Sequence, residues 1–386
     1  MPLTRAFSAP VLFVVAMMWT IWAQAAEPIV VIAPFNLTGP DAVLDAPCYR
    51  GAKLAVEKLN AAGGVLGRPI RLIPVDTASD VSSTANKADS ALKRHPNAVA
   101  GIGFAYSTYA LDAGRVFQKA GLPFITPGAT APDLPQKVGD HMFLAAYGDN
   151  AQALAMAKYA WDELKLRHVA LWIDDSRVYT RTVGDFFDRF FQQFGGTVER
   201  RTYPAGTTDF HDLIAAYKAA DPKLEAIYSA SMPGSAVTLI EQVRDAGIGV
   251  PLLSADGWDD KDIVDASQQK GIKGVYFTTH RFLGVDTSSM KTFVEAYRRK
   301  FDVPPPNAFA PLGFDSVNLL VAAIERAGST KPDAIRAALA ETRGFQGLVG
   351  EIAYAPGKRV PDKAVSVIRI DDGVESPVWT WRPRPQ

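Results

Sequence analysis

The stretch GAKLAVEKLNAAGGVLGRPIRLIPVD, residues 51–76, decides the fold class of this chain. Its first part places Ala52, Ala55, Val56 and Leu59 on one face of a helix, because they recur at the i, i+3, i+4, i+7 spacing. A pair of glycines ends that helix, and residues 70–76 then form an apolar run typical of a strand. An amphipathic helix followed directly by such a strand is the repeating unit of a parallel sheet covered by helices.

The same alternation continues on both sides of this stretch. Nearly continuous apolar runs predict parallel strands that are buried on both faces. The predicted strands cover residues 29–33, 70–76, 98–104, 123–127, 168–174, 198–203, 226–230, 251–255 and 274–279. Two stretches of similar length, 29–145 and 146–275, run through this pattern, which predicts an α/β protein with two doubly wound, Rossmann-like lobes. Residues 345–369 differ, because short alternating strands with Gly and Pro turns are expected there.

Length and charge narrow the function classes. With 386 residues the chain is long enough for two domains. Lys and Arg number 41, and Asp and Glu also number 41. Nucleic-acid binding normally requires a basic surplus, so this balance argues against a nucleic-acid partner.

The N-terminus has the pattern of a signal peptide. Arg5 supplies a positive charge, and the apolar run 11–22 that follows is short for a membrane span. Residues 23–25, Ala-Gln-Ala, then offer a cleavage site after Ala25. The alternative is an uncleaved anchor, against which Glu27 and Pro28 and the lack of a basic flank count.

The one cysteine, Cys48, cannot form an internal disulfide. It also lies too far past the predicted cleavage site to carry a lipid anchor. We therefore expect a plain buried thiol, and a periplasmic protein that is secreted without lipid.

No motif supports catalysis. The five histidines match neither HExxH nor any metal-ligand spacing with the cysteine. Gly101 and Gly103 suggest a dinucleotide fingerprint, but Tyr106 stands where its third glycine belongs. Neither a GxSxG elbow nor a P-loop is present. We therefore expect no enzyme, no cofactor and no metal; the enzymatic alternative is a hydrolase that uses Asp256.

Polar loops follow several predicted strands, at the sheet edge where open α/β sheets bind ligands. The candidate ligand-binding residues in these loops are Tyr106, Ser107, Thr108, Gly128, Ala129, Thr130, Tyr179, Asp256 and Trp258. Hydroxyls and backbone N–H groups at a helix N-terminus suit an anionic group, while a carboxylate with aromatics suits a cation or a ring. The alternative is structural: Ser107 and Thr130 as N-caps, and Asp256 as a turn residue.

These residues carry a resemblance that extends over nearly the whole mature chain. The motifs are Thr38-Gly39-Pro40, residues 51–56 and 60–70, residues 120–123, Thr126 to Pro132, Tyr203 to Phe210, and Phe345-Gln346-Gly347 with Gly350. In this order and spacing they resemble the branched-chain, or hydrophobic amino acid and amide, substrate-binding proteins of ABC transporters, which have the type I periplasmic-binding fold.

The resemblance implies roles for single residues. Ser107 and Thr130, with Ala129, would hold a ligand carboxylate and amino group from the first lobe, with a backbone carbonyl from Gly128. Tyr179 would close from the second lobe, and Asp256 would pair with a ligand ammonium. Leu44 and Ser231 stand where relatives often carry aromatics, and Tyr106 replaces a serine. These departures leave the ligand open among an amino acid, an amide and an aromatic or other small organic acid.

The resemblance also predicts how the chain is organised. Lobe 1 would span 27–146 and 279–345, and lobe 2 would span 147–278 and 346–386, with a three-stranded hinge between them. A monomer would capture a small molecule by closing its lobes and present it to a membrane permease. The alternative is a sensor with the same fold that reports to a receptor or regulatory partner.

Overall fold

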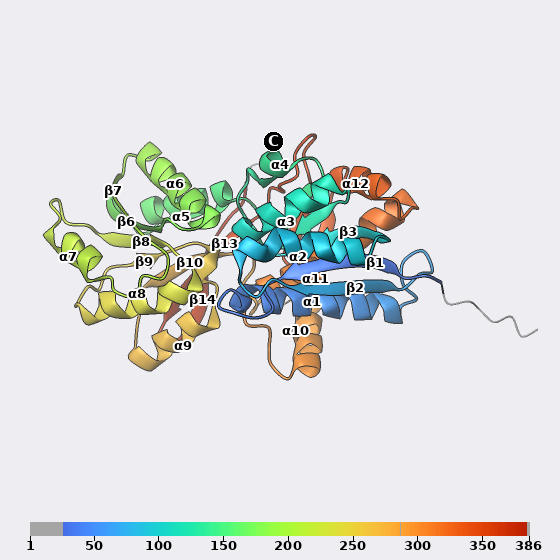
Figure 1. The fold of residues 1–386 in the computed structure, drawn as a ribbon. Coiled ribbons are helices and arrows are strands. Elements are labelled where there is room, and N and C mark those ends of the chain that lie inside the picture. The colour runs from blue at the N-terminus through green and yellow to red at the C-terminus, as the bar shows by residue number, and fades with distance from the viewer. Residues whose placement is uncertain (1–25, 286, 384–386) are drawn as a thin grey trace, which may run out of the picture.

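The computed structural model describes residues 26–285 and 287–383, which form two α/β lobes lying side by side (Figure 1). The first lobe is built on a parallel sheet of order β2-β1-β3-β4-β5. Its strands are β1 (Ile29–Phe35), β2 (Ile70–Asp76), β3 (Ala98–Ile102), β4 (Phe124–Thr126) and β5 (Met142–Leu144). Its helices are α1 (Ala42–Ala61), α2 (Val81–Arg94), α3 (Ser107–Lys119), α4 (Leu134–Val138), α10 (Ser288–Phe301), α11 (Phe309–Ala327) and α12 (Pro332–Ala340). The hairpin β11 (Phe345–Gly347) and β12 (Gly350–Ile352) lies against α11.

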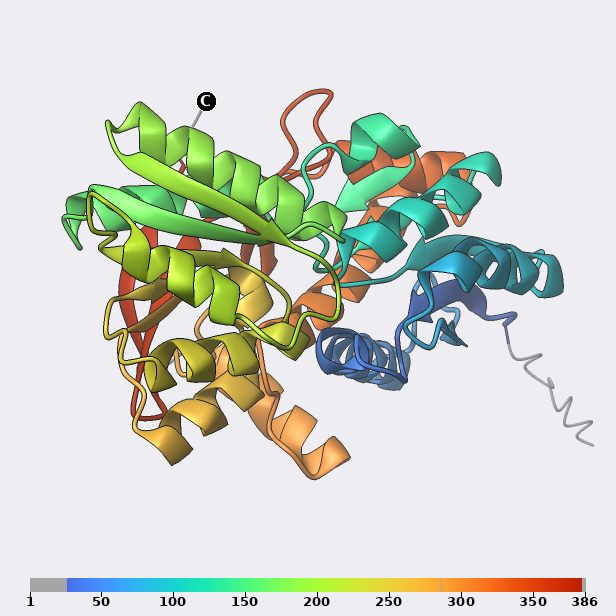
Figure 2. The ribbon, with the colours of Figure 1, turned by 60° about the vertical axis from the view of Figure 1, so that its left-hand side comes forward.

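The second lobe is built on a seven-stranded sheet of order β14-β13-β10-β9-β8-β6-β7. Its parallel strands are β6 (His168–Asp174), β7 (Thr197–Tyr203), β8 (Ala226–Ala230), β9 (Leu252–Leu253) and β10 (Val275–Thr279), and β13 (Val365–Asp371) and β14 (Val374–Trp381) add an antiparallel hairpin. Its helices are α5 (Asp149–Asp162), α6 (Val178–Gln193), α7 (His211–Ala219), α8 (Pro233–Asp245), the 3-10 turn η1 (Asp256–Trp258) and α9 (Lys261–Lys270). Figure 2 shows the red C-terminal strands behind the green and yellow elements of this lobe.

Three connections join the lobes: β5 to α5, β10 to α10, and β12 to β13. They lie against one another. The Lys363 ammonium of the third donates to the carbonyl of Ala145 in the first at 3.0 Å. The ring of Tyr147 in the first stacks on His280 in the second, with 4.0 Å between centroids. Residues far apart in the chain thus form one packed hinge. After the second connection the chain returns to the first lobe, where Figure 1 shows the orange helices α10 and α11 beside the blue α1.

Two glycines explain how tightly the first lobe packs. A Cβ on Gly51 of α1 would lie 1.8 Å from the carbonyl oxygen of Ala310, and one on Gly313 of α11 would lie 1.9 Å from that of Cys48. Helices α1 and α11 can therefore cross in direct backbone contact only because both positions lack a side chain. Cys48 at this crossing is a free, buried thiol, as the sequence predicts.

Several predicted strands agree with the structure, and they include the partly exposed run 70–76 as well as buried runs. The runs 168–174 and 226–230 are strands with the predicted bounds. The run 98–104 ends earlier, at Ile102, because the chain turns at Phe104, which has a φ of 67°. The run 251–255 is reduced to Leu252–Leu253, and the short strand β5 was not predicted.

The predicted signal peptide, residues 1–25, lies outside the described residues. In the described ranges, 26–285 and 287–383, no helix combines the length and the apolar character that crossing a membrane requires.

Candidate functional site

A small cavity lies between the two lobes, and both of them line it. The first lobe contributes Leu44, Ala105, Tyr106, Thr130 and Phe309, and the second contributes Tyr179, Met232, Asp256 and Gly257. Five helices begin at this cavity: α1, α3, α6, α8 and α11 each contribute a lining residue from the N-cap position or the first turn. Because a helix N-terminus carries partial positive charge, the backbone around this cavity favours an anionic group.

The loop before α3 is fixed by two side chains beneath it. The Asp45 carboxyl accepts the backbone N–H of Ala105 at 2.5 Å and two N–H groups of Asn36 at 2.8 Å. Burial raises the pKa of Asp45 to about 8, against the opposing effect of these hydrogen bonds. The Ser107 hydroxyl oxygen accepts the backbone N–H groups of Thr130 and Ala131, which ties the start of α3 to the next loop. The first-lobe wall is therefore preorganised.

Asp256 supplies the charge of the second-lobe wall. It begins η1, is 2% exposed, and lies at the carboxyl end of β9. Its Oδ1 accepts from the Gln152 amide at 2.9 Å, and its Oδ2 lies 3.0 Å from Nε2 of His280. The Asp256 carboxylate is thus hydrogen-bonded on both oxygens, and its position on the cavity wall suits it to a cationic group.

Tyr179 closes the same wall. Its hydroxyl oxygen accepts the backbone N–H of Gly257 at 2.9 Å, which joins α6 to η1. Burial raises the pKa of this phenol well above its ordinary value, so it stays neutral. A neutral phenol bound as an acceptor still has its own O–H to donate.

Across the mouth of the cavity the two lobes touch directly. The Arg177 guanidinium of the second lobe lies 2.8 Å from Oδ2 of Asp41 in the first lobe. The backbone N–H of Val178 donates to the Thr108 hydroxyl at 3.3 Å. The structure therefore shows the lobes closed over the cavity.

Comparison with known proteins identifies the family. The model of a family described as periplasmic binding protein matches residues 28–375. This chain belongs to that family. It is 28% identical to the Leu/Ile/Val-binding protein homolog 3 of Brucella melitensis over 345 residues, which are 89% of this chain and 91% of that protein. The resemblance stated from the sequence is thereby confirmed.

Solved structures agree. The branched-chain amino acid transporter substrate-binding protein LivJ of Streptococcus pneumoniae, in complex with isoleucine, has a TM-score of 0.84 and 26% identity, over 92% of this chain and 100% of that one. An R. palustris solute-binding protein in complex with benzoate has a TM-score of 0.80 over 92% and 97% of the two chains, but at 21% identity it shows the fold alone. The predicted fold class, two doubly wound lobes with a three-stranded hinge, is confirmed.

Family membership also decides two broader predictions. Periplasmic binding proteins bind solutes, so the protein is a ligand-binding protein and not an enzyme. The sensor alternative is not favoured, because the similar LivJ structure is named as a transporter substrate-binding protein. Membership further indicates a location outside the cytoplasm.

Five of the eleven residues that the sequence singled out line the cavity of this binding protein: Leu44, Tyr106, Thr130, Tyr179 and Asp256. Leu44 lies in the first turn of α1 and not in a loop. Ser107 is the first residue of α3 and bonds the neighbouring loop instead of capping its own helix.

The other predicted residues lie around the cavity wall. Thr108 bonds the second lobe, and the Trp258 indole N–H donates to the Ser231 hydroxyl at 2.8 Å, which satisfies the indole. Ala129 is fully buried, and its N–H donates to Thr126. Gly128 faces Phe309 so closely that a Cβ would lie 2.6 Å from the ring.

Four lining residues escaped sequence reasoning: Ala105, Met232, Gly257 and Phe309. The first three adjoin predicted site residues, so widening each motif by one position would have included them. Phe309 carries no local signal, since it arrives from α11 after the second connection.

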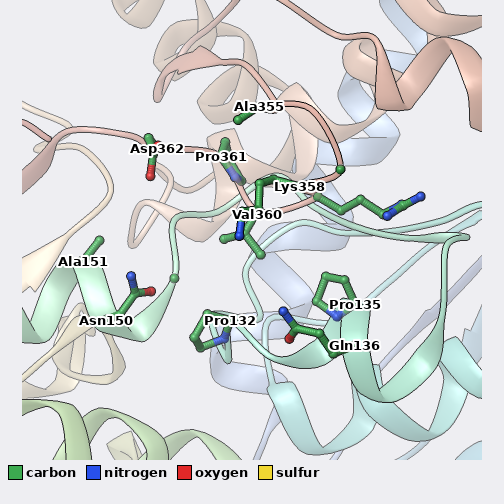
Figure 3. Close-up of a pocket in the computed structure, with 13 residues that line it drawn as sticks. Pro132, Pro135, Gln136, Asn150, Ala151, Ala355, Lys358, Val360, Pro361 and Asp362 are labelled. Carbon is green, nitrogen blue, oxygen red and sulfur yellow. The ribbon is translucent and has the colours of Figure 1, made fainter. Parts of the chain in front are cut away.

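A second hollow lies beside the hinge. Figure 3 shows Pro132, Pro135 and Gln136 facing the loop that carries Lys358 and Val360. None of the predicted site residues lines it. We therefore place the candidate site in the cavity between the lobes.

Proposed function

We propose that this protein is the substrate-binding component of an ABC importer and captures a small zwitterion with an apolar side chain, an α-amino acid, between its lobes. The observation that carries this proposal is the charge pattern of the cavity. Helix N-termini meet there from both lobes, and one buried carboxylate, Asp256, lies on the wall. A ligand with an anionic and a cationic group complements both features.

The cavity also argues for the rest of the ligand. The side chains of Leu44, Met232 and Phe309 form apolar walls, and Tyr106 and Tyr179 add aromatic surface. Burial of an apolar ligand side chain against such walls adds affinity but does not orient the ligand. The polar groups of the cavity determine how the ligand is oriented. An aromatic acid without a cationic group would leave Asp256 buried and uncompensated, so we place it second.

Transport by this protein would follow from lobe closure. The ligand would bind first to the loops of the first lobe, at Ser107 and Thr130. Closure would then add Tyr179 and Asp256 from the second lobe, and a membrane permease would recognise the closed form. We expect a periplasmic monomer released by cleavage after Ala25.

For the domain boundaries we propose one refinement. The sequence assigned residues from 346 onward to the second lobe, yet the hairpin β11–β12 lies against α11, and the backbone N–H groups of Leu348 and Val349 donate to Asp315 there. We therefore end the first lobe after β12. The remaining predicted boundaries, at 146 and 279, stay as stated.

Isothermal calorimetry with L-leucine, L-isoleucine, L-alanine and benzoate tests the proposal, with small-angle scattering to follow compaction. We expect saturable binding of at least one amino acid, a smaller radius of gyration in its presence, and loss of binding in Asp256→Asn. Binding of benzoate alone, with Asp256→Asn unaffected, would show that the assigned ligand chemistry is wrong.

A further inference from the structure

Gln152, in the first turn of α5, is fixed by hydrogen bonds around its whole amide. Its Nε2 donates to Oδ1 of Asp256 and to Oδ1 of Asp149, both at 2.9 Å. Its Oε1 accepts the backbone N–H of Asp256 at 3.1 Å and the Thr278 hydroxyl at 2.9 Å. The amide therefore cannot rotate without breaking contacts to three residues, and it grips both the backbone and the side chain of Asp256.

His280 approaches the other oxygen of the same carboxylate. Because a carboxylate only accepts, the ring carries its proton on Nε2 and donates to Oδ2 of Asp256. Nδ1 is buried and has no hydrogen-bond partner among the residues that the structure describes. The ring stacks on Tyr147, with an interplanar angle of 24°. His280 follows β10 and Tyr147 follows β5, so these two rings belong to two of the three connections between the lobes.

We propose that Gln152 and His280 are positioning residues that aim the Asp256 carboxylate at the cationic group of the ligand and couple its orientation to the hinge. This inference rests on the proposed function. Asp256 sits on a three-residue turn after a two-residue strand, which gives it little local support. Charge-assisted hydrogen bonds from both sides supply that support. Gln152 lies on α5 in the same lobe as Asp256, whereas His280 lies in the second connection between the lobes, so a rotation of the lobes that moves the His280 ring also moves the carboxylate.

The charge state of His280 affects how strongly Asp256 attracts a ligand ammonium, because a protonated ring would neutralise the carboxylate. Burial lowers the pKa of His280, and the hydrogen bond to Asp256 opposes that shift only in part. The titratable groups that surround the pair of His280 and Asp256 are Tyr147 in the first connection, Lys363 before β13, and Asp149 and Asp259 near Tyr147. Acid would protonate Nδ1 and place a cation against Asp256, where it competes with a ligand ammonium. Affinity should therefore fall as the pH is lowered.

Calorimetry with L-leucine between pH 5 and pH 8 tests the role of each residue. His280→Gln replaces the imidazole N–H by an amide N–H that can still donate but cannot titrate, and His211→Gln, at an exposed histidine, is the matched control. We expect wild-type protein and the control to lose affinity as the pH is lowered toward 5, and His280→Gln to lose markedly less. Gln152→Met keeps the shape without hydrogen bonds and should weaken binding by roughly 10–100-fold, the effect of losing a hydrogen bond to a charged group. An unchanged pH profile in His280→Gln together with unchanged affinity in Gln152→Met would overturn the inference.

Two further measurements separate this inference from the proposed function. If Asp256→Asn binds L-leucine as tightly as the wild type, the assigned ligand contact fails, and the inference fails with it. The second measurement uses no ligand: nuclear magnetic resonance follows the titration of the His280 ring. We expect a midpoint below 6.5 in the wild type and a lower one in Asp256→Asn, because the carboxylate favours the imidazolium. Equal midpoints would refute the coupling even if Asp256 proved essential for binding.

Discussion

The ion pair between Asp41 and Arg177 offers the sharpest test of how closure is stabilised. It joins the first turn region of α1 to the start of α6, and the Tyr109 hydroxyl donates to the same carboxylate oxygen at 2.5 Å. The pair joins residues of the two lobes, so we expect it to break when the lobes separate. We expect Arg177→Met, which keeps the apolar stem and removes the charge, to favour the open form and so to weaken ligand binding.

The exposure of the two side chains sets the magnitude. Asp41 is 7% and Arg177 is 26% exposed, so the pair lies between two measured limits. Exposed pairs contribute about 0–1 kcal/mol, and breaking a fully buried pair costs about 3–5 kcal/mol. A cost of about 1–2 kcal/mol for closure follows, which raises the Kd about 5–30-fold if binding requires the closed form.

Calorimetry with L-leucine measures that change, and small-angle scattering of the protein without ligand measures the shift toward the open form. Arg200→Met is the matched control, because Arg200 pairs with Asp185 inside the second lobe at 2.6 Å and cannot sense closure. The Asp41→Asn variant and the double variant complete a cycle that isolates the pair. Equal affinity and equal scattering for Arg177→Met and Arg200→Met would refute the reasoning.

Three other outcomes follow from the same structure. Gly51→Val should lower the Tm by several degrees or prevent folding, because its side chain meets the Ala310 carbonyl, whereas Gly234→Ala in open space on α8 should raise it slightly. The buried carboxyl of Asp45, with a pKa raised to about 8, binds a proton that the unfolded chain releases near pH 4. The free energy of unfolding therefore falls as the pH rises from about 4 to 8, by up to about 1.4 kcal/mol for each pH unit. Calorimetric scans of Asp45→Asn should show a flatter dependence of stability on pH. Ser107→Ala removes the acceptor that ties two loops of the first lobe and should weaken L-leucine binding about 5–30-fold without changing the scattering curve of the protein alone.

The sequence predicted the sheets well because parallel strands buried on both faces need unbroken apolar runs. The run 168–174 shows this, since all but its first residue are buried. The edge of the sheet where ligands bind was predictable for the same reason, because loops at the carboxyl ends of parallel strands converge. Asp256 was found in this way even though its strand has only two residues.

The sequence could not predict which side chains pair when they lie far apart in the chain. Trp258 and Ser231 were predicted separately as ligand contacts, and the structure shows the Trp258 indole N–H donating to the Ser231 hydroxyl. His280 drew no attention because no neighbour in sequence gives it a role; its partner Asp256 lies 24 residues away. Phe309 reaches the cavity only because the chain crosses the hinge a second time.

The charge pattern of the cavity also explains why closure should depend on a ligand. Closing the lobes brings the N-termini of α1, α3 and α11 toward those of α6 and α8, and like partial charges then face one another in a space with little water. A ligand carboxylate between these helix ends is attracted to both lobes and so offsets the repulsion. The ammonium group of the same ligand balances the negative charge of Asp256. The ion pair of Asp41 and Arg177 stabilises the closed form without any ligand, so it contributes to the equilibrium between the open and closed forms of the free protein. Closure by a ligand is in this view a population shift, whose size equals the difference between the ligand's affinities for the two forms. A molecule that carries only one of the two charges gains only part of that difference.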